Sequence, residues 1–258
     1  MSRRDVGSLL GVAIDRRSLD QVLEDARAAV ARCGPRMIFA CANPHSLVAA
    51  YQDTAFFFAL NRASHIVADG VGVSIMAKLA GTKIGPRITG SNFFMGLMRG
   101  LEERGGGRVF FFGSSPTVLD RIGTRCARDF PSVTLCGLLS PPYGDWSEEE
   151  NAAMLAEINT ARPDVLWVGM TAPKQEKWVD ANRALLNVPV VASIGAVFDF
   201  FAGTYPRAPH WMCRLGMEWV FRLIKEPQRM WRRNFVSSPI FVLLVLRHHL
   251  LRPQAQSS

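Results

Sequence analysis

Short segments that consist mostly of apolar residues recur through the first 205 residues of this chain, and helical segments separate them. The apolar segments lie at residues 9–14, 36–42, 65–68, 108–112, 133–138, 165–169 and 188–194. Largely apolar strands that alternate with helices are typical of a parallel sheet buried on both faces. We therefore predict an α/β fold, with a Rossmann-like, mostly parallel sheet and helices on both of its faces.

The composition changes after residue 205. The chain carries a net charge of +8, and the nine basic residues and two acids between 206 and 258 supply +7 of it. Pro227 and Pro239 divide this tail into three short segments, which predicts helices rather than further strands. We predict a catalytic domain at residues 1–205 and a basic, amphipathic, helical C-terminal appendage at residues 206–258.

No segment of the tail has the length of a membrane span. Its longest apolar run, residues 240–246, ends at Arg247, whereas a spanning helix needs about 20 apolar residues. Trp211, Trp219 and Trp231 lie among the basic residues, a combination typical of a bilayer interface. We expect the appendage to associate with a membrane surface. A tail that contacts nucleic acid instead is the alternative.

Cysteine and histidine usage bears on the compartment and on metal binding. The five cysteines form no C-x-x-C pair, and the five histidines show no H-E-x-x-H spacing. These patterns argue against a disulfide framework and a zinc site. Asp15, Arg16 and Arg17 interrupt the first apolar run, so no signal peptide is evident. We expect a cytoplasmic protein, attached peripherally to the inner face of the plasma membrane.

The residues that follow each predicted strand are candidates for a site, because ligands of open parallel sheets bind beyond the carboxyl ends of the strands. Asn43, Asp69 and Gly113 each occupy such a position, as does the segment 168–176. The carboxylate of Asp69, which Gly70 follows, could accept a proton from a substrate hydroxyl. An Asp-Gly turn without a catalytic role is the alternative.

Several residues near these strand ends could bind phosphate groups. Arg87 could offer two parallel hydrogen bonds to a diphosphate, or could lie in solvent. Thr89 or Ser91 could cap the next helix, whose N-terminus would suit a phosphate. Gly113 and Ser114 resemble a nucleotide-binding turn without the full G-x-G-x-x-G pattern, and a plain strand-to-helix turn fits equally well. The chain has no D-x-D pair, so we expect no metal and a diphosphate neutralised by cations or amides.

The segment after the strand at 165–169 predicts another helix start. Thr171 is a candidate N-cap, with Pro173 near the first helical position. Lys174, Gln175 and Glu176 then lie in the first turn, where they can reach a ligand at the edge of the sheet. We take Lys174 as a further candidate for binding the nucleotide.

Six strings, in order and spread from about residue 9 to 246, resemble the WecG/TagA/CpsF glycosyltransferases (glycosyltransferase family 26). These strings are CANPHSLVAA, VADGVGV, RITGSNFF, VGMTAPKQEKW, GAVFDFFAGTYPRAPHWM and RLGMEWVFRLIKEPQRMWRR. The resemblance implies a metal-independent, inverting transfer without a cofactor. The donor would be a UDP-sugar of the N-acetylmannosamine, glucose or uronic acid type. The acceptor would be a polyprenyl-diphosphate-linked sugar of bacterial surface polysaccharide or exopolysaccharide biosynthesis.

The resemblance also assigns roles to residues. The family's general base falls on Asp69. Its T-x-N pair falls on Cys41 and Asn43, so a weakly donating thiol replaces the threonine hydroxyl. Arg87 and Gln175 match residues that would line the pocket, and Thr89 belongs to the same string as Arg87. The best candidates for neutralising the diphosphate from the appendage are Arg214, Arg222 and Arg229.

A different Rossmann-type enzyme, such as a nucleotide-sugar epimerase or a methyltransferase, is the second alternative. The chain lacks the full dinucleotide-binding fingerprint, which argues against the epimerase. The sequence leaves open the donor sugar, the acceptor linkage and whether the chain forms a homo-oligomer.

Overall fold

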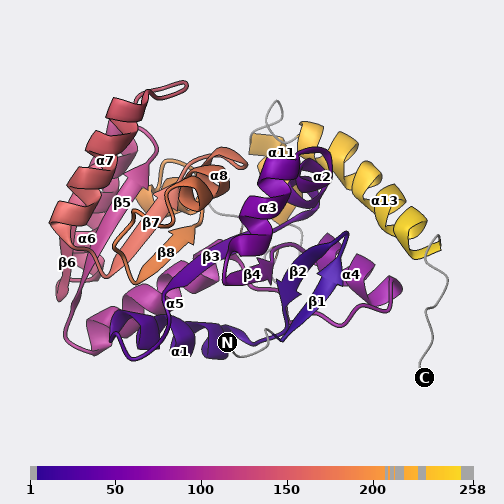
Figure 1. Ribbon diagram of the computed structural model, residues 1–258, viewed down its shortest axis with the longest axis horizontal. Helices are drawn as coiled ribbons and strands as arrows, with labels where there is room; N and C mark the ends of the chain where they lie inside the picture. Colours follow the sequence, from indigo (N-terminus) through magenta and orange to yellow (C-terminus); the bar gives the residue numbers. More distant parts are fainter. Residues whose placement is uncertain (1–4, 207–208, 210–211, 213–217, 226–230, 251–258) are drawn as a thin grey trace.

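A six-stranded parallel sheet forms the centre of the structure, a computed structural model that describes residues 5–206, 209, 212, 218–225 and 231–250 (Figure 1). Its strand order is β4-β3-β8-β7-β5-β6. The strands are β3 (Met37–Ala42), β4 (His65–Ala68), β5 (Gly107–Gly113), β6 (Val133–Leu139), β7 (Val165–Gly169) and β8 (Val190–Ser193). Every hydrogen-bonded pair in this sheet is parallel. The predicted α/β fold is confirmed.

One predicted strand is wrong. Residues 9–14 do not form a single strand; β1 (Val6–Leu9) and β2 (Val12–Asp15) pair as a separate antiparallel hairpin. Leu10 and Gly11 between them have φ values of 51° and 82°, as a tight hairpin turn requires. Glycine adopts such angles without strain, and it allows the chain to reverse where the apolar run predicted continuity.

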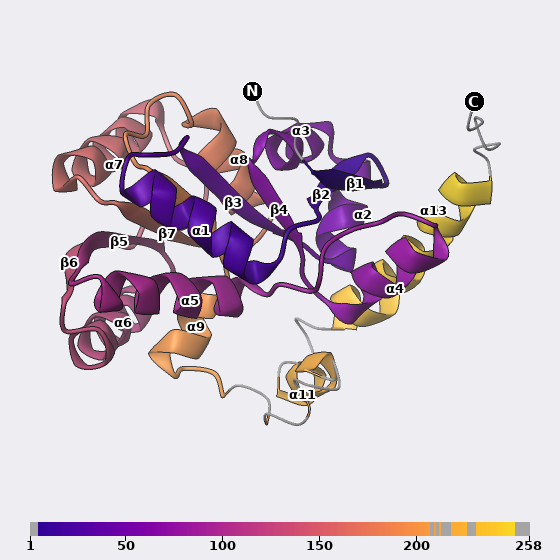
Figure 2. The same cartoon turned by 90° about the horizontal axis from the view of Figure 1, so that it is seen from below.

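Helices connect the strands and cover both faces of the sheet (Figures 1 and 2). Up to residue 202 they are α1 (Leu19–Val30), α2 (Pro44–Gln52), α3 (Thr54–Arg62), α4 (Val71–Leu79), α5 (Gly90–Glu103), α6 (Pro116–Asp129), α7 (Glu148–Ala161), α8 (Lys174–Ala181) and α9 (Val197–Ala202). Ser18 caps α1 and Thr89 caps α5, each accepting a backbone N–H three residues on. The predicted cap at Thr171 is wrong, because α8 begins only at Lys174, with Pro173 before it.

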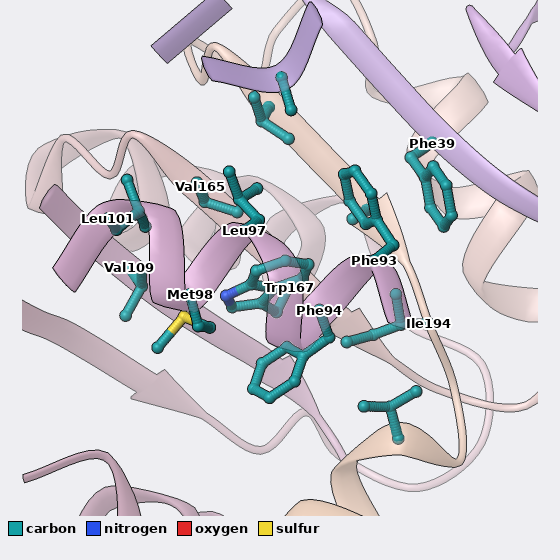
Figure 3. Close-up of a cluster of buried hydrophobic side chains, with 14 of the residues drawn as sticks. Phe39, Phe93, Phe94, Leu97, Met98, Leu101, Val109, Val165, Trp167 and Ile194 are labelled. Atoms are coloured by element: carbon teal, nitrogen blue, oxygen red, sulfur yellow. The ribbon is translucent and has the colours of Figure 1, made fainter. Parts of the chain in front are cut away.

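Aromatic packing fixes α5 on one face of the sheet (Figure 3). Phe93 of α5 stacks on Phe39 of β3, with ring centroids 3.9 Å apart and planes within 9° of parallel. Phe94 meets Trp167 of β7 edge to face at 4.9 Å. The opposite face carries a second apolar cluster, in which Phe112 lies 4.4 Å from Trp178 of α8. The sheet is therefore buried on both faces, as its largely apolar strands predicted.

The C-terminal segment ends in elements that pack against α2. It contains α11 (Glu218–Lys225), the π-helical segment η1 (Arg232–Ser237) and α13 (Ser238–Leu250). Phe241 and Val245 of α13 are buried in the same apolar cluster as residues of α2, α3 and α4. Ser237 of η1 also binds His45 in the first turn of α2, at 2.8 Å. The end of the chain therefore completes a core that the first 205 residues begin.

Among the described residues, no helix combines the length and the apolar character that crossing a bilayer requires.

Replacing Phe241 by alanine should weaken this core. Its side chain is 1% exposed, so we expect the free energy of unfolding to fall by about 3 kcal/mol through lost burial and a new cavity. Leu243→Ala is the control, since that side chain lies on the same helix but is 66% exposed and should cost less than about 0.5 kcal/mol. Urea unfolding of the full chain measures both values. Equal stability of the two variants would contradict the packing of α13.

Candidate active site

The carboxyl ends of four strands surround one pocket. β3, β4, β7 and β8 contribute to it, and it holds about 590 Å3 of unoccupied space, including its open mouth. Pockets at the carboxyl ends of parallel strands are the usual ligand sites of such sheets. Its polar lining comes from Cys41, Asn43, Ser46, Asp69, Thr171, Gln175, Glu176 and Ser193. Four residues that the sequence marked as site candidates, Cys41, Asn43, Asp69 and Gln175, are therefore brought together.

Asp69 lies directly beyond the end of β4. Its backbone N–H donates to the carbonyl of Ala42 at 2.8 Å, which continues the pairing of β4 with β3 by one residue. Gly70, with φ of 109°, then turns the chain into α4. A side chain at this angle would be strained, so glycine allows the carboxylate to stand at the strand end with a helix starting two residues later.

Asn43 has a structural function as well as a place in the pocket. Its side-chain oxygen accepts the N–H of Ser46 at 3.0 Å, and the Ser46 hydroxyl accepts the N–H of Asn43 at 2.8 Å. This reciprocal cap starts α2 and holds the side chain in one orientation. The amide nitrogen of Asn43 is then the group that can donate to a ligand.

The thiol of Cys41 lies in an environment that keeps it protonated. Burial raises its pKa well above the ordinary value, and the negative charges of Asp69 and Glu176 act in the same direction. The backbone N–H of Gly90, at the start of α5, lowers the pKa but does not outweigh these effects. Cys41 therefore presents a neutral S–H group to the pocket, next to two carboxyl groups.

Gln175 and Glu176 form the wall of the pocket that α8 supplies. Both side chains are buried. Gln175 accepts the N–H of Met170 at 3.3 Å and donates to the Glu176 carboxylate at 2.8 Å, so both of its polar atoms are engaged. The sequence placed Glu176 in the first turn but did not select it for the pocket. Its signal was its place in the 168–176 segment beyond a strand end.

The end of β8 contributes residues that sequence reasoning missed. Gly195 and Ala196 line the pocket directly after this strand. The strand at 188–194 was predicted, and the strand-end rule applied to it would have found both residues. The missed signal was therefore present in the sequence.

Arg87 and Thr89 flank the pocket without lining it. The backbone N–H of Ile88, between them, donates to the carbonyl of Ala68 at 2.9 Å, so this segment runs beside the end of β4. The hydroxyl of Thr89 accepts the N–H of Asn92 at 3.1 Å as the cap of α5. Of the two caps considered for this helix, Thr89 is the one used.

The three nucleotide-binding candidates lie elsewhere along the same edge of the sheet. Gly113 and Ser114 follow β5, and the carbonyl of Ser114 accepts the hydroxyl of Ser140 at 2.7 Å. The Lys174 ammonium lies 3.8 Å from the ring centroid of Trp146 and donates to the carbonyl of Gly144. None of the three lines the pocket around Asp69. Their assignment to the nucleotide stays a prediction.

The tail arginines cannot be assigned to the pocket. Arg214 and Arg229 lie outside the described residues. Arg222 belongs to α11, and its side chain also lies outside them. In the part of the chain that is described, no three His, Cys, Asp or Glu residues are grouped so as to hold a metal ion.

Comparison with known proteins gives this geometry a chemical context. An N-acetylglucosaminyldiphosphoundecaprenol N-acetyl-beta-D-mannosaminyltransferase of Bacillus subtilis (strain 168) is 31% identical, over 81% of this chain and 79% of the relative. The enzyme of the same name from Bacillus spizizenii is 33% identical, over 80% and 77%. That from Staphylococcus aureus (strain MW2) is 25% identical, over 93% and 91%.

A sequence model of one family covers nearly the whole chain. The model described as the glycosyl transferase WecG/TagA/CpsF family matches residues 7–255. The match includes all four strand ends that form the pocket and extends into the C-terminal segment. The chain is therefore a glycosyltransferase and belongs to the WecG/TagA/CpsF family.

Proposed function

We propose that this glycosyltransferase moves an N-acetylmannosamine-type sugar from UDP to a sugar carried by polyprenyl diphosphate. The names of the relatives support the sugar and the acceptor in this proposal, because they describe an N-acetylmannosaminyl transfer to N-acetylglucosaminyl-diphosphoundecaprenol. UDP as the carrier of the donor sugar comes from the resemblance to the family. Among the donor types considered from the sequence, these names favour N-acetylmannosamine over glucose and uronic acid. They also argue against an epimerase or a methyltransferase.

Asp69 is the proposed general base. The supporting observation is that its carboxyl group lies at the pocket formed by four strand ends, with Cys41, Asn43 and Gln175 around it. The acceptor hydroxyl would give its proton to Asp69 as its oxygen bonds to the anomeric carbon. The bond from that carbon to the diphosphate breaks in the same step, and UDP leaves. A single displacement inverts the anomeric carbon, which would give the β product from an α-linked donor.

The neighbours of Asp69 would orient the sugars. Asn43 offers its amide nitrogen, while the hydrogen bonds of its oxygen keep it fixed. Gln175 and Glu176 hold each other in place, so they form a preorganised polar wall. Cys41 would contact a sugar hydroxyl through its S–H group, where the family pattern has threonine.

The leaving diphosphate would be neutralised without a metal. The chain has no D-x-D pair, and Arg87 flanks the end of β4 beside Asp69. Arg214, Arg222 and Arg229 of the appendage would add positive charge. We propose that the appendage also attaches the enzyme peripherally to the membrane that holds its acceptor, rather than to nucleic acid.

Asp69→Asn should abolish most of the activity. Removing a general base costs roughly 100- to 10,000-fold in rate, so kcat should fall at least 100-fold. Release of UDP in the presence of N-acetylglucosaminyl-diphosphoundecaprenol measures the rate. Asp53→Asn is the matched control, because Asp53 caps α3 and binds Lys177 outside the pocket. A full transfer rate in Asp69→Asn would show that the base is another group.

Chelation should leave the reaction unaffected. We expect the same kcat in EDTA as in Mg2+ or Mn2+, since cationic side chains would carry out the neutralisation. The test is a rate measurement after dialysis against EDTA. Loss of activity that Mn2+ restores would overturn the metal-independent proposal.

Position 41 should require a hydrogen-bond donor. Cys41→Thr restores the family pattern and should retain activity, whereas the similarly shaped Cys41→Val should lower kcat/KM about 3- to 10-fold, the effect of one lost hydrogen bond. Both variants are compared at equal stability, measured by thermal unfolding. Equal kcat/KM in the two variants would exclude a polar contact at this position.

A further inference from the structure

Helix α4 exposes a row of apolar side chains. Val71, Ile75 and Leu79 follow one another at intervals of four residues and so lie on one face of the helix. All three belong to the exposed large apolar side chains of the protein, and their exposed fraction rises from 37% to 64% along the helix. The opposite face of α4 packs into the core through Val73, Met76 and Ala77. An amphipathic helix is thus left with its second apolar row uncovered.

Helix α13, which contacts α4, also exposes apolar side chains. The two helices are in contact and lie along the same side of the molecule (Figures 1 and 2). While Phe241 and Val245 of α13 are buried, three of its other apolar side chains are exposed: Val242, Leu243 and Leu246. Two neighbouring helices, one from the first half of the chain and one from its end, therefore each leave several large apolar side chains exposed. Exposed apolar side chains that gather on one surface mark interaction sites.

The charges on these helices are of one sign. Neither α4 nor α13 contains an Asp or a Glu. Lys78 of α4, Lys83 just beyond it and Arg247 of α13 are exposed. Near an anionic bilayer each such residue adds electrostatic attraction. In a symmetric pair of chains, the same cations would face one another and repel, so the charge pattern favours a lipid surface over a second copy.

Helix α4 begins next to the pocket, which links its exposed apolar row to the acceptor. Val71 lies two residues beyond Asp69, so the apolar row begins at the edge of the pocket. An acceptor linked to undecaprenyl diphosphate keeps its hydrocarbon chain in the bilayer while its sugar reaches the base. A pocket with a lipid-binding face at its rim meets both requirements.

We propose that α4 and α13 together form one face that docks on an anionic bilayer. We call it the α4–α13 face: Val71, Ile75 and Leu79 with Val242, Leu243 and Leu246. Helix α4, which follows Asp69, would then contact the membrane together with the C-terminal segment. The orientation of the acceptor rests on the function proposed above, but docking of the face on lipid does not.

Vesicle flotation of the full-length protein tests the docking. Vesicles of phosphatidylglycerol and phosphatidylcholine are compared with vesicles of phosphatidylcholine alone. The double variant Ile75→Glu/Leu79→Glu should need at least tenfold more anionic lipid for half-maximal binding. Leu185→Glu is the matched control, because Leu185 is 61% exposed, as Leu79 is 64%, but lies in the segment between α8 and β8. Undiminished binding of the double variant would overturn the proposal.

Two further measurements distinguish lipid docking from a folding defect and from self-association. A second double variant, Ile75→Ser/Leu79→Ser, should also weaken vesicle binding. Thermal unfolding of each variant shows whether it is folded. Sedimentation velocity without lipid tests for a second copy on this face. A wild-type dimer that the double variant dissociates, with vesicle binding unchanged, would show self-association and refute lipid docking.

Transfer assays connect the face to the acceptor. The double variant should match the wild type on a soluble acceptor with a short alkyl chain, and should be at least tenfold slower on the undecaprenyl acceptor in vesicles. An equal loss on both acceptors would place the effect in the pocket and refute the proposal. If the wild type transferred to neither acceptor, the proposed function would fail, while vesicle binding would still decide the docking.

Discussion

The hydrogen-bond ladder of β3 is the interaction on which the candidate site depends. This strand pairs with β4 on one side and with β8 on the other, both in parallel. Parallel pairing brings the carboxyl ends of the three strands to one edge, where Cys41, Asp69 and Gly195 line the same pocket. A slip of one residue would turn every side chain of β3 to the other face. The register of β3 therefore determines which groups meet.

Core packing and pocket chemistry are linked through α5. The stacking of Phe93 on Phe39 holds this helix against β3, and its first residue, Gly90, directs a backbone N–H at the Cys41 thiol. The thiol lies among the acidic groups of Asp69 and Glu176 in a region of limited solvent access, which keeps it neutral. An apolar contact on one face of the sheet thus helps to place one backbone donor at the pocket.

Strands and helix starts were predictable where a local signal determines them. His65–Ala68 and Val165–Gly169 are buried and largely apolar, the first is followed by Asp69 and the second ends at Gly169, and both were found with their observed bounds. The reversal at Leu10 was missed because the apolar run continues through it. The cation–π contact between Lys174 and Trp146 could not be predicted either, because it depends on how two segments far apart in the sequence pack together. Asn43, Asp69 and the segment that holds Gln175 came from the strand-end rule, and that rule would have found Gly195 too. Cys41 came only from the resemblance to the family.

One residue, Gly70, separates Asp69 from α4, so the connection is too short for the two to move far apart. With α4 lying on the bilayer as proposed, a hydroxyl could reach the carboxylate only within about one length of this helix, roughly 13 Å, from the lipid surface. The fold would then limit the distance between the lipid surface and the hydroxyl that accepts the sugar. The enzyme would accept a lipid carrier that bears a first sugar. It would not act on a long glycan, because the growing end of such a glycan lies too far from the bilayer. Selection by reach would assign such an enzyme to the opening steps of a glycan.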